Sequence, residues 1–353
     1  MKRMTARRSC QTVYAGKTPI GGEFPISVQS MLNTPAHDIP ASVAQARRLE
    51  AAGCDILRAA VPDMDAVPLI AALKEAVAIP IVADIHFDYR LALEAAAAGG
   101  DKIRINPGNI GEEDRVKAVA DECRRRNIPI RIGVNSGSLE PEILAKYGHP
   151  TAEAMRDSAL YHASLLEKYD FHDIVLSIKS SDVPTMVRAY ELTAEACDYP
   201  LHLGVTEAGT ERMGLIKSAA GIGSLLLHGI GDTIRVSLTA DPEREVKAGI
   251  DLLEGLGLRS GRARLVSCPT CGRTGIDLIR IAGEVEERLK TVRKPITVAV
   301  MGCVVNGPGE AREADVGLAG GKGKVVLFKK GQVIRTVPEE KAVDELMKEI
   351  DGL

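Results

Sequence analysis

Three cysteines near the end of the chain have the spacing of a metal site. Cys268 and Cys271 lie in SCPTCG at 267–272, and Cys303 lies in MGCVVNGPGEA at 301–311. A CxxC turn presents two thiolates on one side, and a third can close over them if the intervening segment folds back. The spacing therefore predicts a metal centre in this region.

The possible fourth ligands restrict which metal centre this is. All seven histidines lie at or before His228, and no cysteine follows Cys303, so a closed zinc site cannot be completed locally. The nearest carboxylates are Glu310, Glu313 and Asp315. Three thiolates with a weak oxygen ligand, or with an open position, favour an iron–sulfur cluster used for chemistry. The alternatives are a zinc knuckle with a distant ligand and three incidental cysteines.

A second group of polar residues lies late in short apolar runs, or just after them. An arginine within a buried strand costs several kcal/mol, of order 3–5, unless it meets an anion. Four arginines and a lysine at one barrel mouth therefore predict a multiply charged ligand, and two phosphoryl groups fit guanidinium forks best. The alternative is pairing with carboxylates, but Asp84 and Glu207 are too few for five cations. The group comprises Gln29, Arg58, Asp84, His86, Arg104, Asn106, Arg131, Asn135, Lys179, Glu207, Arg235 and Ser237.

Two carboxylates in this group have different expected roles. Glu207, between Thr206 and Ala208, is the group best placed to act as an acid, with structural pairing as the alternative. Asp84 is expected to orient hydroxyl groups or an arginine. His86 is either a proton donor or a loop residue, and the sequence does not decide between them.

The elements that position these residues follow a repeating pattern. Eight short apolar runs alternate with longer amphipathic stretches, which predicts a (β/α)8 barrel with its site at the carboxyl ends of the strands. An open doubly wound sheet is the runner-up, but SVQSMLNTPAHD lacks the glycine-rich loop expected after its first strand. The runs are 24–31, 54–61, 79–87, 101–108, 128–135, 172–179, 199–207 and 232–239.

The pattern changes after the eighth run. We predict a barrel over residues 1–258, a linker at RSGR (259–262) and a small α/β domain over 262–353. In the small domain we expect strands at ARLVSC and PITVAVMGC, a glycine-rich loop containing ADVGLAG, and a hairpin at KVVLFKKGQVIRTV. Helices are expected from about Asp277 to Thr291 and at EEKAVDELMKEI. The longer interval 136–171 should hold an extra helix centred on SALYHASLLEKYD.

Composition excludes several classes of function. The net charge of −3, the aromatic fraction of 3% and the absence of Trp argue against a nucleic-acid-binding surface. MKRMTARRSC lacks the apolar core of a signal peptide, and no apolar run approaches a membrane span, so we expect a cytoplasmic protein. Residues 262–353 hold 16 Lys+Arg against 13 Asp+Glu, a balance of +3 that could suit an acidic partner.

The motifs together resemble a known enzyme family. VQSM, ADIHF, IRINPGN, RIGVNSGSL, SIKSSD, GVTEAG, IRVSL, SCPTCGRT and MGCVVNGPGEA resemble the bacterial two-domain 4-hydroxy-3-methylbut-2-enyl diphosphate synthases of the non-mevalonate isoprenoid pathway. The resemblance covers nearly the whole chain. It implies an oxidoreductase that opens the ring of 2-C-methyl-D-erythritol 2,4-cyclodiphosphate with two electrons and the loss of water.

The same resemblance implies roles for particular residues. It implies a [4Fe-4S] cluster held by Cys268, Cys271, Cys303 and the exchangeable ligand Glu310. It places Glu207, Asp84 and Glu310 at the chemistry. The substrate diphosphate would be bound by Arg58, Arg104, Arg131, Asn135, Lys179, Arg235 and Ser237, and the carbon skeleton would be lined by Gln29, Asp84, Asn106, Thr206 and Glu207.

The resemblance also implies partners. Flavodoxin or ferredoxin would donate the electrons, and a head-to-tail homodimer would bring each cluster domain to the barrel of the partner subunit. Two other readings are compatible with the residues alone. One is a barrel transferase of the pterin-binding kind with a structural zinc module, and the other is a metal-dependent regulator that senses a phosphorylated metabolite.

Overall fold

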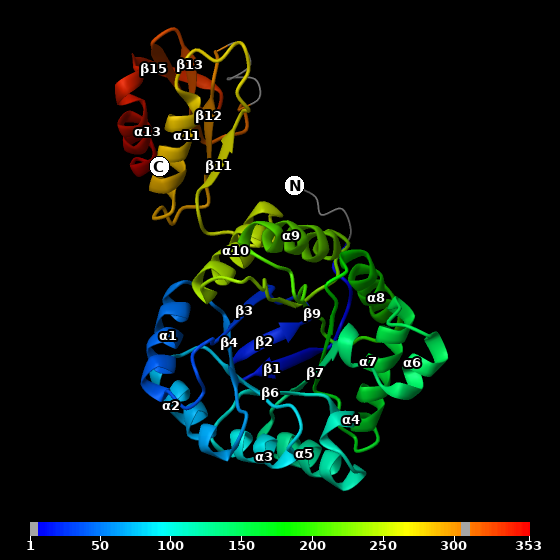
Figure 1. The fold of residues 1–353 in the computed structure, drawn as a ribbon. Helices are drawn as coiled ribbons and strands as arrows, with labels where there is room; N and C mark the ends of the chain where they lie inside the picture. Colours follow the sequence, from blue (N-terminus) through cyan, green and yellow to red (C-terminus); the bar gives the residue numbers. More distant parts are fainter. Residues whose placement is uncertain (1–5, 305–310) are drawn as a thin grey trace. The chain divides into compact units, whose positions relative to one another are not determined.

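A computed structural model of the chain describes residues 6–304 and 311–353. The chain forms two compact units that divide after Arg259, and each is described by itself. In the first unit, helices surround a ring of parallel strands (Figure 1). None of the helices in the described residues has the length and apolar character needed to cross a membrane.

The eight predicted runs of the first unit all contribute to one parallel sheet. Its order is β8-β7-β6-β5-β4-β3-β10-β9, and a parallel bridge between Leu176 and Leu201 joins β8 to the residue before β9. The predicted barrel class is thus confirmed. The strands are β3 Ser27–Met31, β4 Ile56–Ala60, β5 Ile81–Asp84, β6 Lys102–Ile105, β7 Ile130–Asn135, β8 Ile174–Lys179, β9 His202–Leu203 and β10 Thr233–Ile234. The runs at 199–207 and 232–239 therefore keep only two strand residues each.

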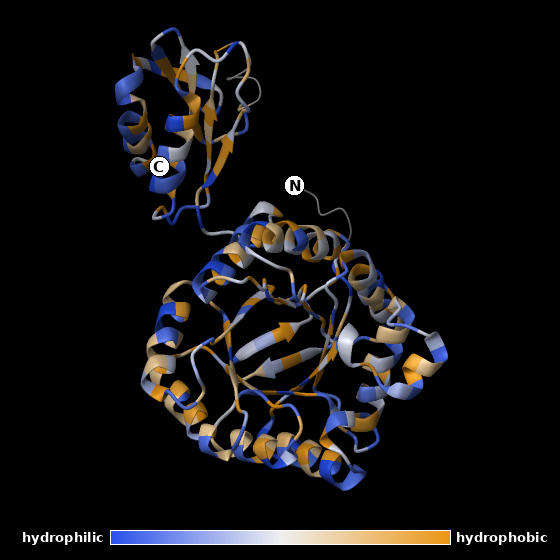
Figure 2. Cartoon of the chain, in the orientation of Figure 1, coloured by the Kyte–Doolittle hydropathy of each residue, from blue (hydrophilic) through white to orange (hydrophobic). Residues whose placement is uncertain are grey.

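Each strand is followed by helix. Figure 2 shows hydrophobic and hydrophilic residues alternating along these helices, as expected where one face packs on a sheet. Aspartates cap several of them: the Asp38 carboxylate accepts from the backbone N–H of Ala41, and that of Asp182 from Thr185. The helices are α1 Ile39–Ala51, α2 Pro68–Ala76, α3 Tyr89–Ala97, α4 Pro107–Ile110, α5 Glu113–Arg126, α6 Pro141–Tyr147, α7 Ala152–Glu167, α8 Val183–Ala196, α9 Glu211–Leu227 and α10 Pro242–Gly255. The interval 136–171 thus holds two helices, α6 and α7.

An antiparallel hairpin closes one end of the barrel. It consists of β1 Thr12–Ala15 and β2 Thr18–Gly21, which lie across the middle of the ring in Figure 1. Val13, Ala15 and Ile20 of the hairpin pack against Ile56, Val82 and Val175 of the barrel strands. This hairpin was not predicted from the sequence, and it gives the barrel an apolar floor.

In its described residues, 260–304 and 311–353, the second unit is a five-stranded mixed sheet with two α-helices. The order β11-β12-β13-β14-β15 begins with three parallel strands and ends with antiparallel pairs. Leu278 and Leu346 belong to the same apolar cluster, so α11 and α13 cover one face of the sheet (Figure 1). The elements are β11 Arg264–Ser267, α11 Leu278–Leu289, β12 Thr297–Met301, β13 Val316–Gly321, β14 Lys324–Lys329, β15 Gln332–Pro338 and α13 Ala342–Asp351.

One expectation for this unit was wrong. The segment ADVGLAG was expected in a loop, but Val316–Gly321 forms the central strand β13 between β12 and β14. At Gly317 an added Cβ would lie 2.6 Å from the Phe328 ring and 2.7 Å from the Ala299 carbonyl oxygen. The glycine therefore permits close packing within a strand rather than marking a loop.

Candidate functional site

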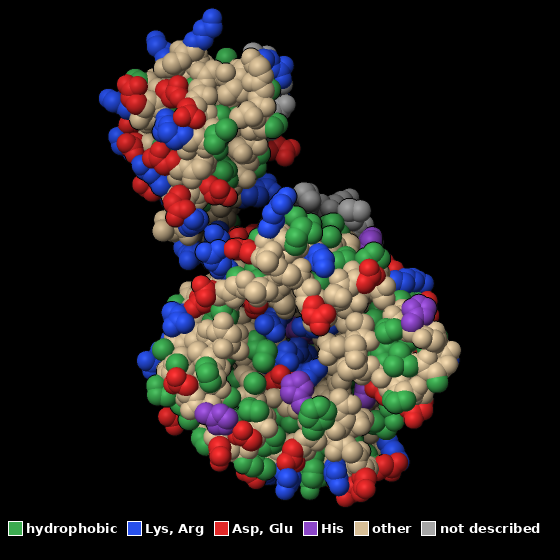
Figure 3. Space-filling view, in the orientation of Figure 1, with side chains coloured by type: hydrophobic (Ala, Val, Ile, Leu, Met, Phe, Trp, Pro, Cys, Tyr) green, Lys and Arg blue, Asp and Glu red, His purple; other side chains and the backbone are tan. Residues whose placement is uncertain are grey.

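The cationic residues predicted from the strand ends gather around one pocket. It occupies about 220 Å³ at the carboxyl ends of the barrel strands. Figure 3 shows Lys and Arg side chains in a hollow at the middle of this unit. The pocket is lined by the predicted residues Arg58, Arg104, Arg131, Asn135, Lys179, Thr206, Arg235 and Ser237, and also by Met31, His86, Gly133 and Ser177.

Asp84 ties two of the arginines together. Its Oδ2 accepts a hydrogen bond from Arg58 Nη2 at 2.6 Å, and its Oδ1 lies 3.4 Å from Arg104 Nη1. Burial alone would raise the pKa of Asp84, but the charge of Arg58, the hydrogen bond from His86 and the charge of Arg104 together hold it well below its usual range. Asp84 is therefore ionised and orients the two guanidinium groups, as the sequence predicted for it.

A second carboxylate, not foreseen from the sequence, pairs with Arg235. Glu245, in the first turn of α10, lies 3.3 Å from Arg235 Nη2 and also accepts from the backbone N–H of Leu238 at 2.9 Å. Asp84 and Glu245 are thus two acids among five cationic side chains. The cationic side chains at the mouth thus outnumber the carboxylates, as the sequence predicted.

Arg131 shows this excess most clearly. Its side chain is 1% exposed, and its Nε and Nη1 have no hydrogen-bond partner among the described residues. Burial, followed by the charges of Arg58 and Arg104, lowers the pKa of Arg131. Because arginine keeps its proton in proteins, the unfavourable burial persists until an anion accepts from the guanidinium.

Lys179 has a comparable environment at the end of β8. Burial and then Arg235, Arg131, Arg58 and Arg104 lower its pKa well below the usual lysine value. A bound anion would reverse the effect of the neighbouring cations, because an opposite charge nearby favours the ammonium form.

Gly133 allows the arginines to approach the backbone of β7. Arg104 Nη2 donates to the Gly133 carbonyl oxygen at 2.9 Å, and the Gly133 N–H donates to Asn106 Oδ1 at 2.8 Å. A Cβ on Gly133 would lie 2.5 Å from Arg104 Nε. Asn106 is therefore used to join the ends of β6 and β7, and it does not line the pocket in the structure.

The loop after β6 is held by a buried histidine of α7. The Gly108 N–H donates to His162 Nδ1 at 3.1 Å, and His162 Nε2 lies 2.5 Å from Glu140 Oε1. His162 is fully buried. Since Nδ1 accepts, the proton lies on Nε2 and is donated to Glu140. The extra helix after β7 thus supplies a contact that fixes the Asn106 loop.

Of the other predicted residues, His86 lines the pocket, whereas Gln29, Asp84 and Glu207 are not among its lining residues. Glu207 is exposed and has a backbone φ of +49°, a left-handed conformation that is uncommon for non-glycine residues and concentrates at functional sites. Gln29 is 1% exposed, and both its amide atoms lack a partner among the described residues. His86 lies near the Asp84–Arg104 pair, with its Nε2 3.4 Å from Asp84 Oδ2.

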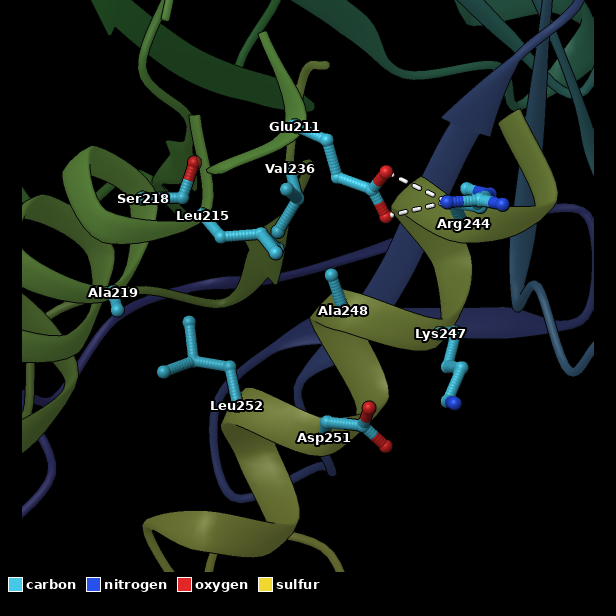
Figure 4. Close-up of a pocket in the computed structure, with 10 residues that line it drawn as sticks. All are labelled: Glu211, Leu215, Ser218, Ala219, Val236, Arg244, Lys247, Ala248, Asp251 and Leu252. Atoms are coloured by element: carbon cyan, nitrogen blue, oxygen red, sulfur yellow. Dashed lines mark hydrogen bonds and ion pairs between the residues drawn. The ribbon is translucent and has the colours of Figure 1, made fainter. Parts of the chain in front are cut away.

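A larger groove lies on the outer helices and not at the strand ends. It occupies about 680 Å³ between α9 and α10 (Figure 4). Its charged side chains include Glu211 and Arg244, whose Oε2 and Nη1 atoms are 2.6 Å apart. None of the predicted site residues lines it. Despite its smaller volume, the mouth pocket has the concentration of unneutralised charge expected of a ligand site.

The cysteines of the second unit follow adjacent parallel strands. Cys268 comes directly after β11, and Cys303 follows two residues after the end of β12. The Gly302 N–H donates to Cys268 Sγ at 3.1 Å, and the Gly275 N–H donates to the Gly302 carbonyl at 3.0 Å. These contacts join the loop containing Cys271 to the loop that carries Cys303.

Cys271 is exposed, and Cys268 and Cys303 are half-buried; all three are unbridged. The backbone N–H of Arg273 is the main cause that lowers the pKa of the Cys271 thiol, which favours the thiolate. Glu310 lies outside the described residues. Within 6–304 and 311–353, no three His, Cys, Asp or Glu side chains are close enough to hold a metal ion.

Glu313 and Asp315 were the other carboxylates considered as ligands from the sequence. Asp315 Oδ2 accepts from the Thr297 N–H at 2.8 Å, which places it where β12 begins, whereas Cys303 follows the end of that strand. Glu313 is exposed. Asp315 is therefore at the opposite end of the sheet from the cysteines.

Two family models match this chain. One, described as the GcpE TIM-barrel domain, matches residues 10–250, and the other, described as the GcpE protein C-terminal domain, matches residues 264–352. The chain belongs to the GcpE family. The family resemblance seen in the sequence motifs is confirmed.

Two curated relatives of this GcpE chain carry the name 4-hydroxy-3-methylbut-2-en-1-yl diphosphate synthase (flavodoxin). The protein of Bacillus cereus (strain G9842) is 58% identical over 351 residues, covering 99% of this chain and 95% of the relative. The protein of Bacillus mycoides (strain KBAB4) is 58% identical over 348 residues, with the same coverage of each chain.

Solved structures resemble the GcpE barrel in fold alone. Dihydropteroate synthase from Stenotrophomonas maltophilia gives a TM-score of 0.51 at 16% identity, covering 70% of this chain and 97% of that one. Dihydropteroate synthase from Xanthomonas albilineans with 4-aminobenzoic acid gives 0.50 at 17% identity, with coverage of 70% and 97%. At this level of identity the likeness shows the barrel architecture alone.

Proposed function

We propose that this chain catalyses the reductive ring opening of 2-C-methyl-D-erythritol 2,4-cyclodiphosphate to (E)-4-hydroxy-3-methylbut-2-enyl diphosphate, with loss of water. The chain is an oxidoreductase of the non-mevalonate isoprenoid pathway, as its relatives are named. The observation that carries the assignment is the pocket at the strand ends, where five cationic side chains meet two acids. Neither the pterin transferase nor the metabolite-sensing regulator is favoured by the family.

The pocket would bind the diphosphate through its unneutralised cations. Arg131 has two guanidinium atoms without partners in residues 6–304 and 311–353, and Lys179 lies among four arginines. Phosphoryl oxygens would accept from these groups and offset their burial. Arg58 and Arg104, oriented by Asp84, and Arg235, oriented by Glu245, would complete the anion site, with Asn135 and Ser237 as neutral donors.

Glu207 is the proposed acid for the departing hydroxyl group. The left-handed backbone conformation of Glu207 costs about 1–3 kcal/mol. Such strained conformations are concentrated at functional sites, where they direct a side chain. Thr206, the residue before it, lines the pocket. Gln29 would contact the carbon skeleton, because both its amide atoms are buried and have no partner within the described part of the chain. Asn106 would position the end of β7.

The proposed cofactor is a [4Fe-4S] cluster held by Cys268, Cys271, Cys303 and Glu310. The thiols fit such a group because they are unbridged, because the pKa of Cys271 is lowered, and because Cys268 Sγ accepts an N–H hydrogen bond of the kind that tunes cluster sulfurs. When bound, the cluster supplies the two electrons and a Lewis-acidic iron. Glu310→Ala should lower iron content without changing the folding of the barrel.

Flavodoxin is the proposed electron donor, since the relatives' names include it, and ferredoxin is the alternative.

We further propose a head-to-tail homodimer, in which each cluster domain serves the barrel of the partner subunit. Mixing Cys303→Ala chains with Arg58→Ala chains should then restore partial activity. Heterodimers that stay inactive would contradict this arrangement. The cytoplasmic location expected from the sequence stays a prediction.

Anaerobic purification followed by an activity assay tests the proposed function. The protein should be brown, absorb broadly near 400 nm and contain roughly four irons per chain. With the cyclodiphosphate and a chemical reductant it should release the linear diphosphate. A colourless zinc protein without turnover would refute the proposal.

A further inference from the structure

A second layer of polar side chains lies inside the barrel, between the pocket and the apolar floor. Lys102 precedes Arg104 by two residues on β6, so both side chains point to the same face of the strand. Lys102 is registered with Val82, which belongs to the floor that packs on the hairpin. His202 Nε2, from β9, is also buried in this layer without a partner among the described residues.

Lys102 is buried without anything to neutralise a positive charge. Its side chain is 0% exposed, and its Nζ has no hydrogen-bond partner among the described residues. The charged or titratable side chains around it are mostly cationic. Arg131, Arg58 and His202 interact with Lys102 directly. The groups that interact with these in turn are Asp84, Arg104, Lys179, Arg235 and Glu245.

The acids of this region are already engaged. Asp84 pairs with Arg58 and Arg104, and Glu245 pairs with Arg235. An unpaired buried ammonium is far less stable than a neutral amine, so Lys102 is neutral while the pocket holds no anion. Burial, then Arg131 and Arg58, lowers the pKa of Lys102 well below the usual lysine range.

We propose that Lys102 takes up a proton when a diphosphate group binds in the pocket above it. This inference rests on the proposed function, because it needs the anion site. Burial would still oppose the positive charge, but phosphate charge beside Arg131 and Arg58 would offset their repulsion of the ammonium. The proton comes from solvent, forms one N–H bond with the lone pair of Nζ, and leaves when the anion is released.

The reaction gives this proton a use. Ring opening frees one phosphate oxygen, so a dianionic substrate becomes a trianionic product while two electrons and one proton enter and water leaves. An ammonium beneath Arg131 would stabilise the additional charge. Lys102 does not line the pocket. It therefore acts through the field in the barrel and not by contact with the substrate.

Calorimetric titration with inorganic pyrophosphate tests the inference. The full chain, purified anaerobically, is titrated near pH 8, between the usual values for histidine and lysine, in buffers with different protonation enthalpies. For each pyrophosphate bound, the unmodified protein should take up more protons than Lys102→Met does, and the difference should be at most about one proton. Lys117→Met, on the outer face of α5, is the matched control and should behave like the unmodified protein.

The outcomes separate this inference from the proposed function. Pyrophosphate binding with equal proton uptake by the unmodified protein and Lys102→Met would refute the role of Lys102 and leave the anion site standing. No binding by the unmodified protein would refute both. If Lys102→Met does not fold, Lys102→Gln must give the same difference. Binding of sulfate, which does not titrate in this range, must also bring proton uptake by the unmodified protein, and zero uptake would refute the inference.

Discussion

The barrel mouth and the cysteine end of the second unit place functional side chains in the same way but in different surroundings. In both, the side chains lie in parallel strands or shortly after them. At the mouth the cations are buried, and two carboxylates orient them. At the cysteine end Cys271 is exposed, and Cys268 and Cys303 are only half-buried. The barrel therefore bears an electrostatic cost before a ligand arrives, and the cysteine end bears little.

The largest expected effect is a loss of turnover caused by a substitution at the cysteine end, which leaves the barrel mouth unchanged. Cys303→Ala should abolish turnover, because a proposed cluster ligand is lost, while pyrophosphate affinity and the thermal stability of the barrel stay unchanged. Cys197→Ala, outside both sites, is the control and should remain active. The measurements are iron content, turnover and calorimetric affinity. Full activity of Cys303→Ala would remove that residue from the proposed site.

Asp84→Asn should produce the largest loss of stability. It leaves Arg58 and Arg104 buried without their shared anion, which should reduce the free energy of unfolding by about 3–5 kcal/mol. Because the pKa of Asp84 is depressed in the fold, its contribution is present above the unfolded value of about 3.9 and is lost as the pH falls further.

The difference between Asp84→Asn and the unmodified protein should therefore be constant above about pH 5 and shrink below about pH 4. Denaturant unfolding across this range measures it. Asp88→Asn, at the N-cap of α3, is the control and should cost under about 1 kcal/mol, because Asn also caps helices. A difference that grows toward acid pH would contradict the orienting role of Asp84.

Arg131→Met should separate binding from stability. It removes a buried cation with unpartnered atoms, so pyrophosphate affinity should fall by about 2–5 kcal/mol, while the free energy of unfolding stays level or rises. Arg124→Met, on the surface of α5, should change neither quantity. If Arg131→Met destabilised the fold as strongly as Asp84→Asn does, the mouth would be a structural ion network and not an anion site.

The smallest expected effect concerns the loop after β6. His162→Phe keeps an aromatic ring but loses the bonds to Gly108 and Glu140, which should cost about 1–3 kcal/mol of stability. KM should rise a few-fold, because Asn106 is held less firmly. His162→Gln should recover part of the KM effect. An unchanged KM with lowered stability would leave His162 a purely structural residue.

The strand order and most of the mouth could be predicted from the sequence. Each β-branched run marked a strand, and these runs carry Arg58 and Arg131 within strands and Lys179 at the end of one. Since parallel strands end at one rim, side chains far apart in the chain were expected to meet. The structure brings them around one pocket.

Other features depended on contacts that the sequence does not display. The hairpin β1–β2 had a usable signal, alternating apolar residues around Ala15–Gly16, which was not used. Lys102 also had a signal, a lysine two residues before Arg104 in a buried run. Glu245 and His162 had none, because polar residues on amphipathic helices are usually solvated and only packing shows which are buried.

Local pattern by itself determined the eight strands, the two groups of functional side chains and the family, because hydrophobic periodicity and residue spacing are properties of the chain alone. Only the tertiary structure decided which charges are neutralised. Pairing and burial arise between elements distant in sequence. They determine that Asp84 and Glu245 are engaged, while Arg131 Nε and Nη1 and Lys102 Nζ have no acceptor in the part of the chain that the structure describes.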